Sequence, residues 1–484
     1  MLQTLKNAWN TKEIRAKILF TLFILLLYRI GTVIPVPFVE ANSFKGAFGG
    51  TILDMLNTLS GGALGTATLF ALGVSPYINA SIIIQLLTIV FPKLGEIGKT
   101  DKEKMNLITR ITTVILAIIT AIGYYFLIRN SDALTNAANP DDNNLYWIYA
   151  IAIIACYVAG ASLIMWLAER INERGIGNGI SIILFANIIS VLPSFFYNLI
   201  SLAVSTWGYS VDAWLYGLVS GIFTVVLLAA IFALIVFIIW VTGSERRISI
   251  QYAKKIVGRK MYGGQSQNLP IKLNMTGVMP VIFASSIVSL VPTILALAGV
   301  SSTTSGFWGT VNNILAADGV VYPVLLFLLI IGFAYFYTQI TFDPVEVSNN
   351  IKKQGGTIPG IRQGRPTAQY IKKILNKVTL VGALFLGIIA VLPVIAGPHI
   401  IQHIIEWVML GSDSVTETIQ YYYNLGLGDY AYTYVAQQVQ SQASSLTSTF
   451  TFGGTTLLIM IGVALETFKE LEAQLTMRNY KGFL

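Results

Sequence analysis

The sequence GVSPYINASIIIQL occupies residues 73–86, and a close copy, GVMPVIFASSIVSL, occupies residues 277–290. Eight of the fourteen aligned positions are identical, and no gap is needed. One interpretation is that both segments are only a common way to begin an apolar helix, with proline near the first turn, where its missing N–H costs little. The other is an internal duplication. The number of identities favours duplication, so we expect two halves, residues 1–205 and residues 206–484.

Outward from this repeat, the chain consists of long apolar stretches with few charges. Of its 484 residues, 55% are hydrophobic and only 11% are charged, whereas soluble domains carry about 25% charged residues. A helix needs roughly 20 apolar residues to cross a bilayer. The apolar runs therefore predict an all-α polytopic membrane protein with ten spans, near residues 17–35, 75–91, 107–128, 147–168, 179–200, 213–241, 275–297, 320–341, 378–396 and 454–471.

Basic residues are distributed unevenly between the two sides that ten spans define. The side with both termini holds 28 of the 31 Lys and Arg residues and 12 acidic residues, for a net charge of 28 − 12 = +16. The other side holds two basic and 11 acidic residues, for 2 − 11 = −9. Because basic loops stay in the cytosol, we expect a multi-pass protein of the cytoplasmic membrane with both termini cytosolic. The first apolar run is expected to stay as a span and not to be cleaved.

On this topology, the two copies of the repeat cross the membrane in opposite directions. Such an inverted repeat is typical of proteins with a central pathway. An ion-coupled small-molecule transporter, the alternative function, normally carries ionisable groups within its spans. Only Arg29 lies well inside a span here, with Glu466 near the cytosolic end of the last one. This scarcity disfavours a transporter, and Arg29 is more simply a structural charge facing protein or headgroups.

The sequence gives no positive indication of a cofactor, a metal site or a catalytic centre. His399 and His403 are the two histidines, spaced i, i+4 as helical metal ligands are, but this pattern alone is weak. Cys156 is the single cysteine and lies in an apolar run, so one chain contains neither a disulfide nor a cysteine metal site. We therefore expect no enzyme and no cofactor.

Two cytosolic loops, about residues 243–273 and 343–377, are basic and contain turn-forming pieces, YGG at 262–264 and IPG at 358–360. Their charges either only fix topology and attract anionic lipid or form a docking surface for a soluble partner or RNA. The turns favour ordered protrusions. The candidate docking residues are Arg246, Arg247, Lys254, Lys255, Arg259, Lys260 and Arg362.

Residues 51–65, TILDMLNTLSGGALG, are helix-like but too short to cross a membrane. They form either a plain external loop or a re-entrant segment buried in protein. The adjacent glycines at 61 and 62 permit a hinge.

Several motifs together closely resemble the bacterial SecY family over nearly the whole chain. They are TILDMLN at 51–57, FALGVSPYINASIIIQLL at 70–87, ERGIGNGIS at 173–181, LPIKLNMTGVMP at 269–280, IPGIR at 358–362 and FGGTTLLI at 452–459. The resemblance implies a channel that carries unfolded secretory proteins across the bilayer and releases membrane segments sideways, through an hourglass pore between two halves.

The resemblance also implies roles for individual residues. The aliphatic pore ring would be Val74, Ile78, Ile180, Leu184, Ile282 and Ile459. The plug, about residues 52–64, would include Leu53, Asp54, Met55, Leu56, Asn57, Ser60, Gly61 and Gly62. Polar contacts across a lateral gate between spans two and three and spans seven and eight would come from Gln85 and Asn274.

Implied partners are SecE-like and SecG-like small membrane subunits, the SecA motor ATPase, the ribosome, and polypeptides with signal sequences. Arg362 would be the prime contact for the motor and the ribosome. The chain departs from the family in two places. The external loop 397–453 is longer than usual, and Val74 and Leu184 replace the more common isoleucine in the ring.

Overall fold

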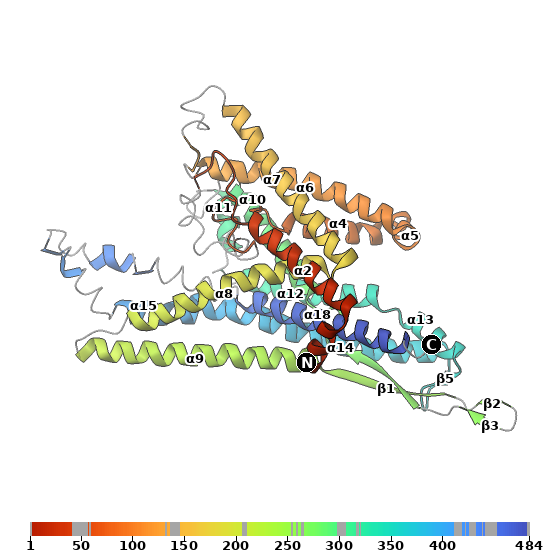
Figure 1. Cartoon of the computed structure of the whole chain (residues 1–484). Helices are drawn as coiled ribbons and strands as arrows, with labels where there is room; N and C mark the ends of the chain where they lie inside the picture. Colours follow the sequence, from red (N-terminus) through yellow and green to blue (C-terminus); the bar gives the residue numbers. More distant parts are fainter. Residues whose placement is uncertain are drawn as a thin grey trace.

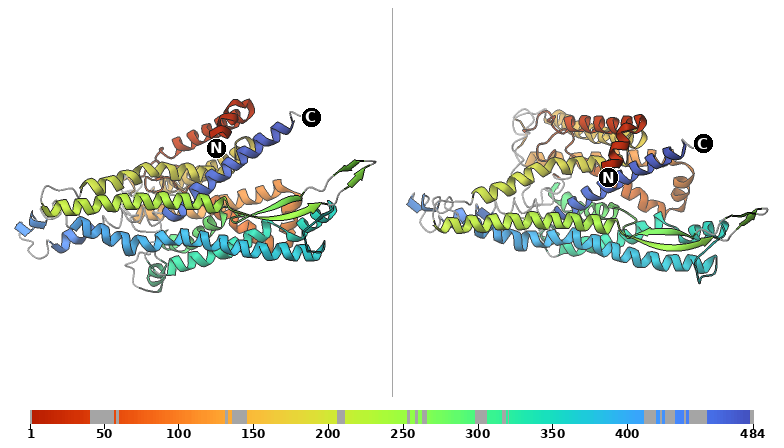
Figure 2. Two further views of the ribbon diagram at one scale, coloured as in Figure 1. Left: turned by 90° about the horizontal axis from the view of Figure 1, so that it is seen from below. Right: turned by 60° about the horizontal axis from the view of Figure 1, so that its bottom comes forward.

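The structure is a computed structural model of the chain. It describes residues 2–40, 57, 60–130, 133–135, 146–205, 211–252, 255–257, 260–262, 266–297, 306–315, 319, 321–410, 419–421, 423–424, 432–437, 439–440 and 453–481. Long helices dominate it, and most of them lie roughly side by side along one direction (Figures 1 and 2).

A helix occupies each of the ten predicted spans (Figure 1). In the first half these are α2 (Lys12–Gly31), α4 (Ser75–Val90), α6 (Lys102–Asn130), α7 (Tyr146–Arg174) and α8 (Gly179–Ser205). In the second half they are α9 (Val211–Thr242), α10 (Met279–Leu297), α12 (Val321–Thr341), α14 (Arg365–Ala396) and α18 (Gly453–Lys481).

Many of these helices suit a membrane by length and composition. Within the described residues, five helical stretches are long and apolar enough to cross one, and they contain most or all of α6, α7, α9, α12 and α14. Shorter apolar helices lie within α4, α8 and α10. Large apolar side chains on the outer faces are exposed, such as Phe23 at 56% and Phe232 at 68%, as expected where lipid is the solvent. The helical membrane fold is confirmed, and ten crossings stay a prediction.

The central apolar core draws side chains from both halves of the sequence. It includes Tyr28 of α2, Ile78 of α4 and Leu184 of α8, together with Ile282 of α10 and Ile459 of α18. Helix α4 packs along α6, and α10 packs along α12, while α10 also contacts α4 and α6. The repeat helices α4 and α10 therefore meet inside the molecule and not on its surface.

The two basic loops form one small sheet, which the turn signals alone did not predict. Strand β1 (Glu245–Tyr252) pairs antiparallel with β4 (Ser266–Lys272) along its length and with the two-residue β5 (Gly356–Thr357) at its end. Strands β2 (Lys255–Val257) and β3 (Lys260–Tyr262) pair beyond them. Helix α13 (Pro344–Lys353) packs against α14, and an apolar cluster with Ile248, Ile351 and Ile371 lies at the base. Within the described residues, both loops thus contain regular strands, and the second also contains a helix.

The N-terminal segment and the C-terminal helix lie together. Helix α1 (Leu2–Asn10) contacts α18, and Ala8, Ile14 and Leu471 share an apolar cluster. The Lys17 Nζ atom donates a hydrogen bond of 3.1 Å to Gln474 Oε1. This proximity agrees with the expectation that both termini lie on one side.

The remaining described helices are short or extend longer ones. These are α5 (Pro92–Thr100), α11 (Phe307–Ile314), the π-helical turn η1 (Gly397–Ile401) and α15 (Gln402–Leu410). Through η1 the chain of α14 runs on into α15, so the start of the predicted external loop 397–453 is helical. Much of the rest of that loop lies outside the described residues.

Candidate functional site

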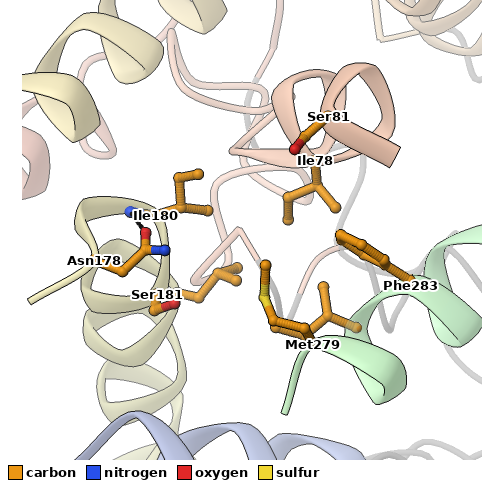
Figure 3. Close-up of a pocket in the computed structure, with 9 residues that line it drawn as sticks. Ile78, Ser81, Asn178, Ile180, Ser181, Met279 and Phe283 are labelled. Carbon is orange, nitrogen blue, oxygen red and sulfur yellow. Dashed lines mark hydrogen bonds between the residues drawn. The ribbon is translucent and has the colours of Figure 1, made fainter. Parts of the chain in front are cut away.

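The two copies of the repeat meet at a small cavity (Figure 3). Ile78 of α4 and Ile282 of α10, which occupy the same position of the repeat, both line it. Ile180 and Leu184, from the first turns of α8, line it too. Its volume is about 20 Å³, room for about one water molecule. Four of the six predicted ring residues are therefore neighbours around one narrow space.

A larger cavity of about 200 Å³ lies on the other side of these side chains. Ile78, Leu184 and Ile282 line both cavities, and Val74 and Ile459 line the larger one. The three shared side chains are buried, with exposures of 7%, 3% and 5%. They form a constriction that separates the two cavities, and all six predicted ring residues lie at it or beside it.

Equivalent positions of the repeat face opposite cavities. In each of three pairs, one residue lines the small cavity and its counterpart in the other copy lines the large one. The pairs are Ser75 with Met279, Asn79 with Phe283, and Ser81 with Ser285. Helices α4 and α10 therefore pass the constriction in opposite directions, as an inverted repeat requires.

Both cavities offer weak ligands. Among the described residues that line them, none is charged. Several hydroxyl groups are engaged with their own helix: Ser285 Oγ donates to the Ile282 carbonyl oxygen at 2.9 Å, and Thr293 Oγ1 donates to that of Ser289 at 2.6 Å. The described lining thus lacks the ionisable groups that ion-coupled transporters normally carry within their spans.

The motif ERGIGNGIS positions the first turn of α8 at the constriction. The Gly179 amide donates to Asn172 Oδ1 at 2.7 Å. The Ile180 amide donates to Asn178 Oδ1 at 3.1 Å (Figure 3). These side chains satisfy amides that a helix start leaves open. A Cβ atom on Gly179 would lie 2.0 Å from the carbonyl oxygen of Ala168. Only glycine lets α8 begin this close to α7, which brings Ile180 to the cavity.

Part of the predicted plug lies within the described residues. Asn57 and Ser60 close a turn: the Gly65 amide donates to Asn57 Oδ1 at 2.8 Å, and the Leu64 amide donates to Ser60 Oγ at 3.1 Å. Leu64 also lines the large cavity. The predicted plug residues Leu53, Asp54, Met55 and Leu56 lie outside the described residues.

Gly61 sits against α2 and α8 in a conformation that favours glycine, with φ at 71°. A Cβ atom there would lie 3.0 Å from Asn187 Oδ1 and 3.2 Å from Arg29 Nη1. Gly62 follows with φ at 87°. Arg29 lies at the end of α2 beside this turn, and its side chain is exposed. This position is consistent with a structural charge.

The two predicted gate residues have different surroundings. Gln85 of α4 accepts a hydrogen bond from the Tyr337 hydroxyl of α12 and donates one of 3.0 Å to Ser81 Oγ. Asn274 lines a separate cavity with Glu466 and Lys469 of α18, and its Oδ1 atom has no partner in the described part of the chain. No described hydrogen bond joins Gln85 to Asn274. Asn274 lies before α10 and faces α18. The cross-helix partner of Gln85 is instead Tyr337 of α12.

The predicted docking residues lie on the protrusions. Arg246 and Arg247 are exposed on β1, where Arg247 Nε lies 2.7 Å from Glu245 Oε1. Arg362 is exposed in the turn after β5, close in sequence to α14. Lys254 and Arg259 lie outside the described residues, and Lys255 and Lys260 are described only as backbone of β2 and β3.

The two histidines lie near the end of α14. His399 lines an apolar groove between α12 and α14, and His403 Nδ1 lies 3.4 Å from Glu406 Oε2. Among the described residues, no group of three or more His, Cys, Asp or Glu side chains is placed to hold a metal ion.

Sequence reasoning missed residues that line the small cavity beside the ring. Asn178 and Ser181 flank Ile180, and Met279 and Phe283 flank Ile282 by one helical turn and by one residue (Figure 3). A signal for the second pair was present, because both positions fall inside the repeat. Tyr337 carried no such signal, since the repeat does not reach α12.

Comparison with known proteins agrees with this geometry. Residues 68–415 match the SecY family model. The chain is 37% identical over 502 residues to the protein translocase subunit SecY of Streptomyces galbus and 38% identical over 500 residues to that of Mycobacterium bovis, covering 100% of each chain.

Solved structures show the same fold. "The structure of a protein conducting channel" superposes with a TM-score of 0.56 at 17% identity, covering 95% of this chain and 92% of that one. Sec61 in a canine ribosome–channel complex gives a TM-score of 0.52 at 16% identity, with the same coverage. None of these relatives supports the small-molecule transporter alternative. The chain belongs to the SecY family and is a protein-conducting channel subunit of a membrane translocase.

Proposed function

We propose that an unfolded polypeptide crosses the cytoplasmic membrane through the constriction between the two cavities. The observation that carries this proposal is that Ile78, Leu184 and Ile282 line both cavities at once. A chain passing from one cavity to the other must push these side chains apart. Val74, Ile180 and Ile459 extend the same apolar ring.

The chemistry of the ring suits this task. Aliphatic side chains at a narrow point disfavour water and offer no ligand to ions. They adapt to a passing chain through rotamer changes without binding it, because they make no hydrogen bonds. The ring can therefore seal around a polypeptide of any sequence. A polar constriction would instead hydrogen-bond to the passing chain and retain it.

The segment 52–64 is proposed as the plug that closes the pore on the external side. Support comes from Leu64, which lines the large cavity, and from the adjacent glycines Gly61 and Gly62, whose positive φ angles form a turn just before it. On this proposal the segment moves aside when a polypeptide enters the large cavity.

Membrane segments are proposed to leave sideways between α4 and α6 on one side and α10 and α12 on the other. The large cavity supports this exit, because residues of α4, of α6 and of α10 line it. Its lining includes Ile83, Ile119 and Ile294, which are also exposed on the outer surface. An apolar segment in the cavity therefore borders directly on lipid.

The halves 1–205 and 206–484 are proposed as the two bodies that separate during opening. This division is supported by the finding that equivalent positions of the repeat, one in each half, line opposite cavities. Both termini and the two basic loops are assigned to the cytosol, because 28 of the 31 basic residues fall on that side.

The sheet of β1, β4 and β5 is proposed as the docking surface for cytosolic partners, a SecA-like motor ATPase and the ribosome. Arg246 and Arg247 are exposed on β1, and Arg362 is exposed in the turn after β5; exposed arginines favour anionic partner surfaces. A related Sec61 is described within a ribosome–channel complex. The motor would supply the energy, and SecE-like and SecG-like subunits would complete the channel.

Disulfide trapping of a stalled secretory chain tests the proposed route. In a Cys156→Ser background, single cysteines replace Ile78, Ile282 or, as a control, Ile118, which is 41% exposed on α6. A disulfide needs Cα atoms within about 7 Å. A single cysteine in the stalled chain should therefore form a disulfide with the channel cysteine at position 78 in one variant and at position 282 in the other.

Ile118 lies in an outer apolar groove with Ile122 and Ile151, away from the constriction. The Ile118→Cys variant should give no adduct. Equal trapping at position 118, or none at either ring position, would reject the route.

A further inference from the structure

A separate cavity, of about 320 Å³, lies where the sheet of β1, β4 and β5 joins the membrane helices. Its walls come from the end of α9, the segment between β4 and α10, one residue of α14, and α18. It shares no described lining residue with the two cavities at the constriction. Its volume falls within the range of small-ligand pockets, about 300–1,000 Å³. We call it the joint cavity.

Asn274 brings a buried polar atom without a described partner to the joint cavity. The residue lines the cavity and is 9% exposed, and its Oδ1 atom accepts no hydrogen bond within the described part of the chain. The neighbouring backbone is held close to α14, because a Cβ atom on Gly382 would lie 2.3 Å from the Leu273 carbonyl oxygen. A buried acceptor without a donor costs free energy. Asn274 is therefore placed to accept a hydrogen bond from a molecule in the cavity.

Charges of both signs line the same cavity without pairing. Lys272, Lys469 and Glu466 are exposed, and none of them makes an ion pair or a hydrogen bond among the described residues. Glu470 also lines the cavity, but its carboxylate accepts a hydrogen bond of 3.0 Å from Gln474 Nε2. Opposite charges that share one cavity attract each other and pair where they can reach. The gap between them therefore fits a ligand with one anionic and one cationic group.

The joint cavity lies at the depth of lipid headgroups. On α9, Trp240 is 70% exposed and its ring stacks on Phe237, with ring centroids 6.3 Å apart. Tryptophan is enriched at the boundary between membrane and water, and Thr242, which lines the cavity, follows two residues later. Ile238 and Leu458 add an apolar part to the lining. This combination suits a headgroup that is joined to acyl chains.

We propose that the joint cavity binds a phosphoethanolamine group, carried by a phosphatidylethanolamine lipid of the cytosolic leaflet. The phosphate lies between Lys272 and Lys469, since lysine binds phosphate as a point charge. The primary ammonium donates to Asn274 Oδ1 and faces Glu466. A phosphate alone would leave Asn274 without a donor, and a water molecule would leave the lysines without a counter-charge. The leaflet rests on the topology proposed above, whereas the site itself does not.

Photo-crosslinking in vesicles tests the site. The channel with its companion subunits is reconstituted in phosphatidylglycerol vesicles that contain a phosphatidylethanolamine probe with a photoreactive group near the glycerol. Mass spectrometry should find the probe on the segments that line the cavity, residues 272–278 and 466–470. Unlabelled phosphatidylethanolamine added in place of phosphatidylglycerol should displace it. Because the probe is present in both leaflets, an error in the proposed topology would not affect the result.

Two variants each remove one contact to the headgroup. Asn274→Leu should lower labelling about tenfold, because a hydrogen bond from a charged donor is lost. The loss of an unpaired buried acceptor relieves its desolvation cost, so channel abundance should not fall. Lys469→Gln, at an exposed position of α18, should lower labelling about two- to fivefold. The matched control Lys353→Gln makes the same charge change at the exposed end of α13, outside the cavity, and should label like the wild type.

Asn274→Asp keeps an acceptor oxygen and should keep the labelling, which separates loss of the contact from general distortion. Soluble glycerophosphoethanolamine identifies the source of the ligand. No competition supports the membrane lipid, and full competition supports the phosphoethanolamine site with a soluble source. Equal labelling of the same segments by a phosphatidylglycerol probe, or unchanged labelling in both Asn274→Leu and Lys469→Gln, would overturn the proposal.

Discussion

Helices α4 and α10 share a sequence motif and a position at the constriction but differ in how firmly each is held. Both place an isoleucine at the boundary of the two cavities, Ile78 and Ile282. One residue later, α4 has the half-buried Asn79, whereas α10 has Phe283, which is 2% exposed and packs against rings of α12. The shared positions build the constriction, and Phe283, at a position that differs between the copies, anchors α10 to α12.

The largest expected difference lies at this pair of positions. Phe283→Ala should lower the free energy of unfolding by about 3 kcal/mol, the lower end for a buried phenylalanine, because contacts with Phe333 and Tyr337 are lost and a void remains. Asn79→Ala should cost less than about 1 kcal/mol. Thermal unfolding of the purified channel in detergent measures both. Equal losses would show that the two helices are anchored alike.

An intermediate loss of unfolding free energy, equal at the two positions, is expected when the first glycine of each repeat copy is replaced. Gly73 and Gly277 have φ angles of 56° and 64°, and an added Cβ atom would meet no steric clash at either position. Alanine at each should therefore cost about 1–2 kcal/mol from backbone strain alone. The same unfolding assay measures both variants. A clearly larger loss of stability at one glycine would show that the two turns are not equivalent.

The smallest effects concern the position occupied by Gln85 in α4 and Ser289 in α10. Ser289 Oγ donates at 3.1 Å to the Ser286 carbonyl oxygen of its own helix, so Ser289→Ala should change stability by less than about 0.5 kcal/mol. Gln85→Ala loses a bond to another helix and should cost about 0.6–1 kcal/mol. A greater loss for the serine variant would contradict the assignment of the cross-helix contact to α4.

Sequence reasoning located the helices well where glycine and proline mark their ends, as Gly73, Pro76 and Pro92 do for α4. The span predicted at 75–91 is α4, Ser75–Val90. It failed where a helix continues beyond the apolar run: α14 begins at Arg365, well before the predicted residue 378, because its first turns are cationic and exposed outside the apolar layer. Hydropathy marks the apolar segment and not the end of the helix.

The site was predictable to the extent that the repeat and the family motifs reach it. Ile78 and Ile282 follow from the repeat, whereas Tyr337 lies outside it and contacts α4 only through folding. The pairing of β1 with β5 was equally hidden, since β5 has two residues and its partner lies far along the chain. Asn274 looked like a gate residue beside the repeat, yet its side chain lines the cavity near α18. Local patterns do not encode such long-range choices.

The small cavity has a consequence for the energy supply of the cell. Protons move through proteins by hopping along unbroken files of hydrogen-bonded water. A space of about 20 Å³ bounded by Ile78, Leu184 and Ile282 holds about one water, too few for a continuous file. Such a file ends at these side chains. We therefore expect the constriction to limit proton leakage through a channel that holds no polypeptide.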